Sequence, residues 1–161
     1  TVGPAISTLT FFRGDSQKAK ALLQQRLTSL VVANPWLAGA LVKKNGQLEL
    51  QYPSAISDSH IEALFNPTLR GGKKRKPPVV SSNMSFQELC KAVGGSSAEI
   101  LAGSACINKP EALVALTVVP DDKKPDTFAV VFSVSHVIAD GFTYYKLLAM
   151  LSSGSEITTL S

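Results

Sequence analysis

Charged residues are scarce in this chain, and their scarcity limits the kinds of protein it can be. Only 17% of the 161 residues are charged, whereas 45% are hydrophobic. This composition is apolar for a globular protein. It favours one domain with a large buried core, over residues 1–161. It is also typical of a domain that buries further surface against a partner chain.

The chain also has little cysteine and no long apolar run. Its only cysteines are Cys90 and Cys106, which are too few for a disulfide framework or a zinc site. We therefore expect no metal site and a reducing compartment. No apolar stretch is long enough to span a bilayer, and no signal peptide is visible at the N-terminus. These absences favour a cytoplasmic protein without a membrane span.

Positive charge is concentrated in one segment, RGGKKRKPP at residues 70–78. The net charge is +4, and removing the five positive charges of this segment leaves −1. The rest of the chain therefore offers no basic face for nucleic acid. Glycine, proline and like charges predict a flexible, solvated loop. A phosphate-binding or anion-binding role is the alternative, although the spacing is not that of a P-loop.

The spacing of apolar residues predicts the order of helices and strands. Asp15 or Ser16 caps the first helix, and the Asn34-Pro35 pair ends it. Asn45-Gly46 predicts a hairpin turn, and Ser85 with Glu88 forms a capping box. The expected strands are residues 5–12, 38–43, 47–52, 112–119 and 128–134, and the expected helices are residues 17–33, 59–65, 85–93 and 141–151.

This order predicts the fold class. Sequential hairpins without regular crossover helices favour an α+β protein. We expect a two-layer sandwich in which helices cover one face of a mainly antiparallel or mixed sheet. The strands at 112–119 and 128–134 should form an antiparallel hairpin.

The strongest sign of function lies between the last strand and the last helix, in His136-Val-Ile-Ala-Asp140-Gly141. Imidazole can take a proton from a hydroxyl, an amine or a thiol near neutral pH. Asp140 can orient the imidazole as in a triad, or turn away and pair with a cation. Gly141 would relieve crowding where the turn enters the helix. In the alternative interpretation, the backbone satisfies His136 and Asp140 is an ordinary helix cap.

The helix after this motif places Phe142, Tyr145, Leu148 and Leu151 on one face, which we expect to pack on the core. Of Tyr144 and Tyr145, one should be a core residue and the other can line a pocket. The pattern does not distinguish between them.

The segment SHVIADG resembles the HxxxDG signature of the chloramphenicol acetyltransferase-like superfamily, which includes BAHD acyltransferases and nonribosomal-peptide condensation domains. A first strand that ends near Arg13, the segment NPWLAGAL and the Asn-Gly hairpin also resemble that fold. The resemblance implies that His136 is the general base, which deprotonates an acceptor that attacks an acyl thioester. It also implies that Asp140 is structural and pairs with Arg13.

The chain differs from its relatives in two ways. Ser135 precedes His136, which resembles the single-histidine pattern of BAHD enzymes more than the paired histidines of other branches. The second half of the two-half members, with its DFGWG-like motif, is not in this sequence. Thr1 stands where a start Met is expected. The resemblance therefore implies either a trimeric short form or the N-terminal half of a longer enzyme, with the site between two units.

We therefore expect an acyltransferase that uses acyl-CoA or another acyl thioester as co-substrate, holds no permanent cofactor and acts on a small hydroxyl or amine acceptor. Its partner would be a second copy, as in a trimer, or a missing C-terminal half. The alternative is a catalytically silent domain of the same fold that binds or assembles. Ser104 and Ser133 are possible oxyanion donors, but we expect both to be structural. His60 should be a surface histidine.

Overall fold

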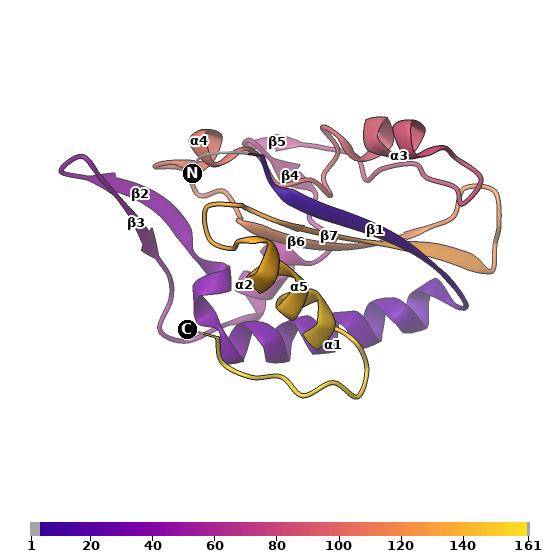
Figure 1. Ribbon diagram of the computed structural model, residues 1–161, viewed down its shortest axis with the longest axis horizontal. Helices are drawn as coiled ribbons and strands as arrows, with labels where there is room; N and C mark the ends of the chain where they lie inside the picture. The colour runs from indigo at the N-terminus through magenta and orange to yellow at the C-terminus, as the bar shows by residue number, and fades with distance from the viewer. Residues whose placement is uncertain (1–3, 161) are drawn as a thin grey trace.

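A three-stranded antiparallel sheet lies at the centre of the computed structural model, which describes residues 4–160 (Figure 1). Its strands are β1 (Ile6–Arg13), β7 (Thr127–Val134) and β6 (Val114–Pro120), in the order β1-β7-β6. β7 pairs with β1 from Arg13 opposite Thr127 to Ile6 opposite Val134. The predicted β6–β7 hairpin is confirmed, since Pro120 lies opposite Phe128 and Val114 lies opposite Val134.

The N-terminal helix and hairpin form as the sequence predicts. α1 (Ser16–Ala33) begins after Asp15, whose carboxylate accepts a hydrogen bond from Gln17 N at 2.9 Å. It ends at Asn34, and a short 3₁₀ helix, η1 (Pro35–Ala38), follows. β2 (Ala40–Lys44) and β3 (Gln47–Gln51) pair across Asn45 and Gly46, whose φ angles are 52° and 78°. Both turn residues therefore adopt the left-handed conformation expected of such a hairpin.

Helices and short strands cover both faces of the sheet. The elements between β3 and β6 are α2 (Asp58–Leu64), β4 (Leu69–Arg70), β5 (Lys73–Lys74), α3 (Phe86–Val93) and α4 (Gly103–Cys106). In Figure 1, α1, α2 and α5 (Gly141–Met150) lie on one side of the sheet, and α3 lies on the other. Ser85 and Glu88 form the predicted capping box of α3. The predicted α+β architecture is confirmed, with α3 and its flanking segment added on the second face.

The basic segment at residues 70–78 differs from the expected loop at its first residue. Leu69 and Arg70 pair with Lys73 and Lys74 as a small hairpin, and Gly71 and Gly72 form its turn with φ angles of 63° and 73°. Arg70 is only 2% exposed. It is not a solvated cation, because its side chain turns inward and donates a hydrogen bond to Ser97 O. The four basic residues from Lys73 to Lys76 are exposed, as predicted.

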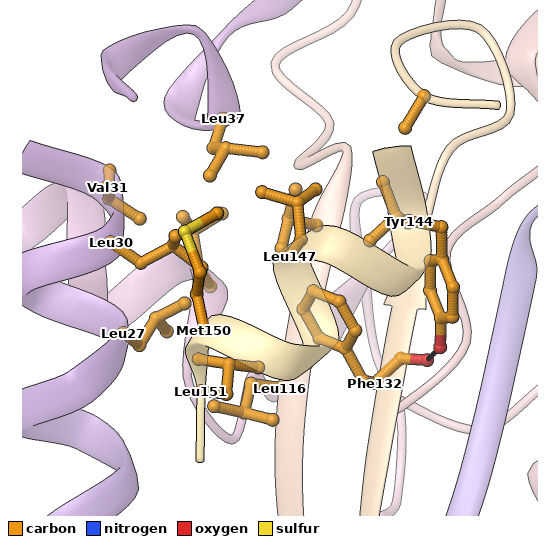
Figure 2. Close-up of a cluster of buried hydrophobic side chains, with 14 of the residues drawn as sticks. Leu27, Leu30, Val31, Leu37, Leu116, Phe132, Tyr144, Leu147, Met150 and Leu151 are labelled. Carbon is orange, nitrogen blue, oxygen red and sulfur yellow. Dashed lines mark hydrogen bonds between the residues drawn. The ribbon is translucent and has the colours of Figure 1, made fainter. Parts of the chain in front are cut away.

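The main core lies between the sheet and the helices α1 and α5 (Figure 2). Leucines of α1 at helical spacing meet α5 and the inner face of β6 and β7. Ten of the packed side chains are labelled in Figure 2: Leu27, Leu30, Val31, Leu37, Leu116, Phe132, Tyr144, Leu147, Met150 and Leu151. No helix within residues 4–160 has the length and hydropathy that a membrane crossing requires.

The rotation of α5 differs from the sequence prediction. Phe142 and Tyr145 are 70% and 60% exposed, whereas Tyr144, Leu147 and Met150 are buried. The prediction failed because both faces of this helix are apolar, so periodicity alone could not choose between them. Tyr144 decides the rotation: its hydroxyl donates to Phe132 O and contacts Thr8 Oγ1, both at 2.7 Å. Burial raises the pKa of Tyr144 to about 12.

The two neighbouring tyrosines provide a test of this packing. Tyr144→Phe removes a buried hydrogen bond, and we expect it to lower the free energy of unfolding by about 1 kcal/mol. Tyr145→Phe is the matched control and should leave stability unchanged, because its side chain is exposed. Urea unfolding followed by circular dichroism measures both variants. Equal effects of the two substitutions would contradict the assigned rotation of α5.

Candidate functional site

His136 lies in a tight turn at the end of β7. The strand ends at Val134, and Ser135 N then donates to Leu113 O at 2.8 Å. Ile138 N donates back to Ser135 O at 3.2 Å, which closes the turn around His136. Backbone hydrogen bonds on both sides therefore determine where the imidazole leaves the sheet.

The apolar residues of the motif anchor this turn. Ala139 is buried in the main core. Val137 and Ile138 pack against a second buried cluster, formed by Leu41, Cys106 and Leu113. Because these three consecutive side chains point inward, the polar side chains on either side of them, His136 and Asp140, are exposed. The motif thus presents its ionisable groups on the surface.

Asp140 is the N-cap of α5. Its Oδ1 accepts a hydrogen bond from Thr143 N at 2.8 Å, and its backbone carbonyl accepts one from Tyr144 N at 2.9 Å. The hydrogen bonds from Thr143 lower the pKa of this carboxyl group, and the nearby His136 lowers it further. Of the three interpretations that the sequence left open for Asp140, the structure supports the helix cap.

The predicted pair between Arg13 and Asp140 is wrong. Arg13 lies opposite Thr127, where β7 begins, whereas the motif follows Val134, seven residues further along β7. At about 3.3 Å per residue this separation is about 23 Å. Antiparallel pairing is the reason, since the end of β1 meets the beginning of β7. Within residues 4–160 no ion pair joins Arg13 to Asp140.

Gly141 does not have the expected steric role. A Cβ atom built on Gly141 would meet no atom within 4 Å, and its φ angle is not in the left-handed region. The turn therefore enters α5 without crowding at this position, and a side chain would fit there.

The remaining candidates make no hydrogen bond to the motif within residues 4–160. The Ser133 hydroxyl is fully buried and accepts hydrogen bonds from Ser7 Oγ at 2.8 Å and from Ile100 N at 3.0 Å, which is a structural role. Ser104 is exposed on α4. His60 is half-buried in α2, where its Nδ1 accepts a hydrogen bond from Ser57 N. The part of the chain that the structure describes has no cluster of side chains suited to a metal ion.

Two of the cavities within residues 4–160 are candidate binding sites, and His136 lines neither. The larger, of about 770 Å³, lies between α2, the start of β2, the β4–β5 turn and residues 109–112. The smaller, of about 220 Å³, is apolar and lies near Phe12 and Phe128, at the opposite end of the sheet from the motif. His136 is itself exposed, so its imidazole faces the surface.

Comparison with known proteins identifies the fold. No protein-family model and no curated protein sequence matches the chain. Among solved structures, a trichothecene 15-O-acetyltransferase from Fusarium sporotrichioides matches with a TM-score of 0.61 and 15% identity, over 93% of this chain and 30% of its own. The chain has the chloramphenicol acetyltransferase-like fold.

Two further matches are an epimerization domain and a condensation domain. The epimerization domain from the third module of tyrocidine synthetase B matches with a TM-score of 0.57 and 14% identity, over 94% of this chain and 29% of its own. A condensation domain that mediates chain release from the enacyloxin polyketide synthase has a TM-score of 0.51 and 14% identity, over 98% and 27%. The chain thus spans less than a third of the length of each of these three structures.

The assigned cap role of Asp140 leads to a stability test. Asp140→Ala removes the cap and should lower the melting temperature, whereas Asp140→Asn should remain close to wild type at pH 7, because Asn also caps helices.

The cap should also make stability depend on pH. The folded-state pKa of Asp140 is lowered, so the stability that its carboxylate contributes is present at pH 7 and is lost as the pH falls from about 3.9 through the folded pKa. Wild type should therefore lose more stability in acid than Asp140→Asn.

A double-mutant cycle with Arg13 is the control. Because Arg13 lies at the other end of the sheet, the effects of Arg13→Met and Asp140→Asn on stability should be additive. A coupling energy clearly above experimental error would show that Arg13 and Asp140 interact, and would contradict their separation in the structure.

Proposed function

We propose that this chain is one unit of an acyltransferase, which transfers an acyl group from a thioester donor to a hydroxyl or amine acceptor. The observation that carries the proposal is the presentation of His136. Its imidazole is exposed at the end of the central strand of a fold shared with acyl-transferring proteins. The side chain has no hydrogen-bond partner within residues 4–160, which leaves it available to an acceptor.

In the proposed reaction, His136 is the general base. Its neutral imidazole takes the proton from the acceptor hydroxyl or amine as that atom attacks the carbonyl carbon of the thioester. The resulting tetrahedral oxyanion collapses, forms the new ester or amide and expels a thiolate. The imidazolium returns its proton to the thiolate, so His136 ends the cycle neutral. The donor would be acyl-CoA or a carrier-bound thioester, and no resident cofactor is needed.

Asp140 would not orient the imidazole as in a catalytic triad. Its Oδ1 is committed to Thr143 N as the cap of α5. We therefore assign Asp140 a structural role, and Arg13 none in the reaction.

A second unit would complete the site. Next to the motif, Phe142 and Tyr145 present large apolar side chains to solvent from the first two turns of α5. Exposed apolar surface of this kind is typical of an interface, and binding sites commonly form between two domains. The solved relatives contain about three times as much chain. We propose that another copy or a C-terminal half supplies the second wall and the oxyanion donor.

The alternative function is a catalytically silent module of the same fold that binds a partner through this face. The open position of His136 and the missing triad geometry at Asp140 are compatible with it. Acyl transfer by the assembled protein distinguishes the two, because a silent module would have no activity that depends on His136.

The two histidines of the chain provide a matched test of the base. We expect His136→Gln to lower kcat by roughly 10²–10⁴-fold, because the proton transfer loses its acceptor. His60→Gln should retain activity, since His60 lies in α2 and contacts Ser57 rather than the motif. Thioester consumption by the assembled protein is the measurement. Full activity of His136→Gln would refute the base assignment.

Assembly gives an independent test. Native mass spectrometry of the 161-residue chain should show a trimer, or binding of a separately expressed C-terminal half of the same enzyme. Replacing both Phe142 and Tyr145 with Ser should weaken that association, because it removes apolar contact area. Phe86→Ser is the control, since Phe86 is 80% exposed on α3, on the other face of the sheet. A monomer with full acyltransferase activity would contradict the proposal.

A further inference from the structure

Arg70 carries a deeply buried charge that the proposed chemistry does not use. Its side chain is 2% exposed, and that of Glu111 beside it is 10% exposed. Arg70 Nη2 donates to Ser97 O at 2.7 Å, and Nη1 lies 4.0 Å from Glu111 Oε2. Burial lowers the pKa of the guanidinium, and Glu111 acts in the opposite direction. Removing a charge from water to this depth costs free energy unless an opposite charge and hydrogen bonds compensate it.

The two groups that Arg70 contacts belong to two separate segments. Ser97 begins the segment at residues 97–101, which leads from α3 toward α4. Glu111 begins the segment at residues 111–113, which leads into β6. The first segment is also held by a backbone hydrogen bond from Ser97 N to Lys76 O at 3.0 Å, whereas Arg70 reaches both segments from one side chain. A guanidinium can join them because its donors point in several directions from one planar group.

Both segments also hold the end of β7. In the first, Ile100 N donates to Ser133 Oγ at 3.0 Å. In the second, Leu113 O accepts from Ser135 N at 2.8 Å. Ser133 and Ser135 flank Val134, the last residue of β7, and His136 follows directly. Arg70 is thus linked to Ser133 through the segment at residues 97–101 and to Ser135 through the segment at residues 111–113.

We propose that Arg70 is a positioning residue for His136. Its guanidinium contacts both segments that hydrogen-bond to the end of β7. It therefore restricts movement of the turn that carries His136. The role resembles the one that the sequence suggested for Arg13, but it acts through Ser97 and Glu111 and not through Asp140. Its effect on catalysis rests on the proposed function, whereas its effect on the turn does not.

Amide hydrogen exchange tests the mechanical part on the 161-residue chain. In Arg70→Met, which keeps an unbranched stem but removes the charge and the donors, the Ser135 and Ile100 amides should exchange at least about tenfold faster. The amide of Asp121 is the internal reference, because it donates to Thr127 O at the far end of the sheet. Its exchange should remain at the wild-type rate. Lys74→Met, an exposed charge removal in the same hairpin, should change none of the three rates.

Glu111→Gln distinguishes the two contacts of Arg70, and it replaces Arg70→Met if that variant does not fold. The substitution weakens the ion pair with Glu111 and leaves the hydrogen bond to Ser97 O in place. Exchange of the Ser135 amide should therefore accelerate, while that of Ile100 stays near wild type. Arg70→Lys should give an intermediate result at both amides. Unchanged exchange at Ser135 in Glu111→Gln would overturn the proposal. Equal acceleration of the Asp121 amide in Arg70→Met would also overturn it, because the role would then be general stability.

Steady-state kinetics of the assembled protein test the catalytic part. Misplacement of a catalytic group lowers turnover more than binding. Arg70→Met should therefore lower kcat by about tenfold or more and leave the KM for the acceptor nearly unchanged. A raised KM with unchanged kcat would refute positioning. If His136→Gln proves fully active, the proposed function fails, and the exchange experiment still decides whether Arg70 holds the turn.

Discussion

The pairing of β7 with strands on both of its sides is the constraint on which the rest of the structure depends. β1 and β6 hydrogen-bond to it along nearly its whole length. This pairing determines which end of the sheet receives His136 and which receives Arg13. It also provides the inner surface on which α1 and α5 pack, with Phe132 as the link to Tyr144. A slip of one residue in the register would turn the apolar side chains of β7 to the opposite face.

The motif loop packs its apolar side chains inward and leaves its two ionisable side chains, His136 and Asp140, exposed. Val137, Ile138 and Ala139 are held in two apolar clusters, so the loop cannot move without losing buried area. Asp140 begins α5 and thereby fixes where the helix starts. The imidazole of His136 is consequently presented by a rigid support, although it is itself exposed. This arrangement suits the proposed role of His136 as a general base, because a fixed position lowers the entropy that a reaction must overcome.

Polar groups beneath the loop add a second level of support. Ser133 bonds to both Ser7 and Ile100, and Ser135 bonds to Leu113. These contacts satisfy buried polar atoms that would otherwise be costly. Arg70 lies behind them and reaches the same segments from the β4–β5 hairpin. The exposed side chains of Phe142 and Tyr145 follow the motif on the first two turns of α5.

The sequence by itself determined the local elements and the fold class. Asp15 and Ser85 as caps, the Asn45-Gly46 turn and the β6–β7 hairpin all depend on neighbouring residues, and all were predicted correctly. The rotation of α5, the separation of Arg13 from Asp140 and the burial of Arg70 were decided only by the tertiary structure. Each depends on contacts between residues far apart in the chain, such as Tyr144 with Thr8, Arg13 with Thr127 and Arg70 with Ser97. Periodicity and composition carry no information about such partners, because strand pairing and packing between distant segments select them.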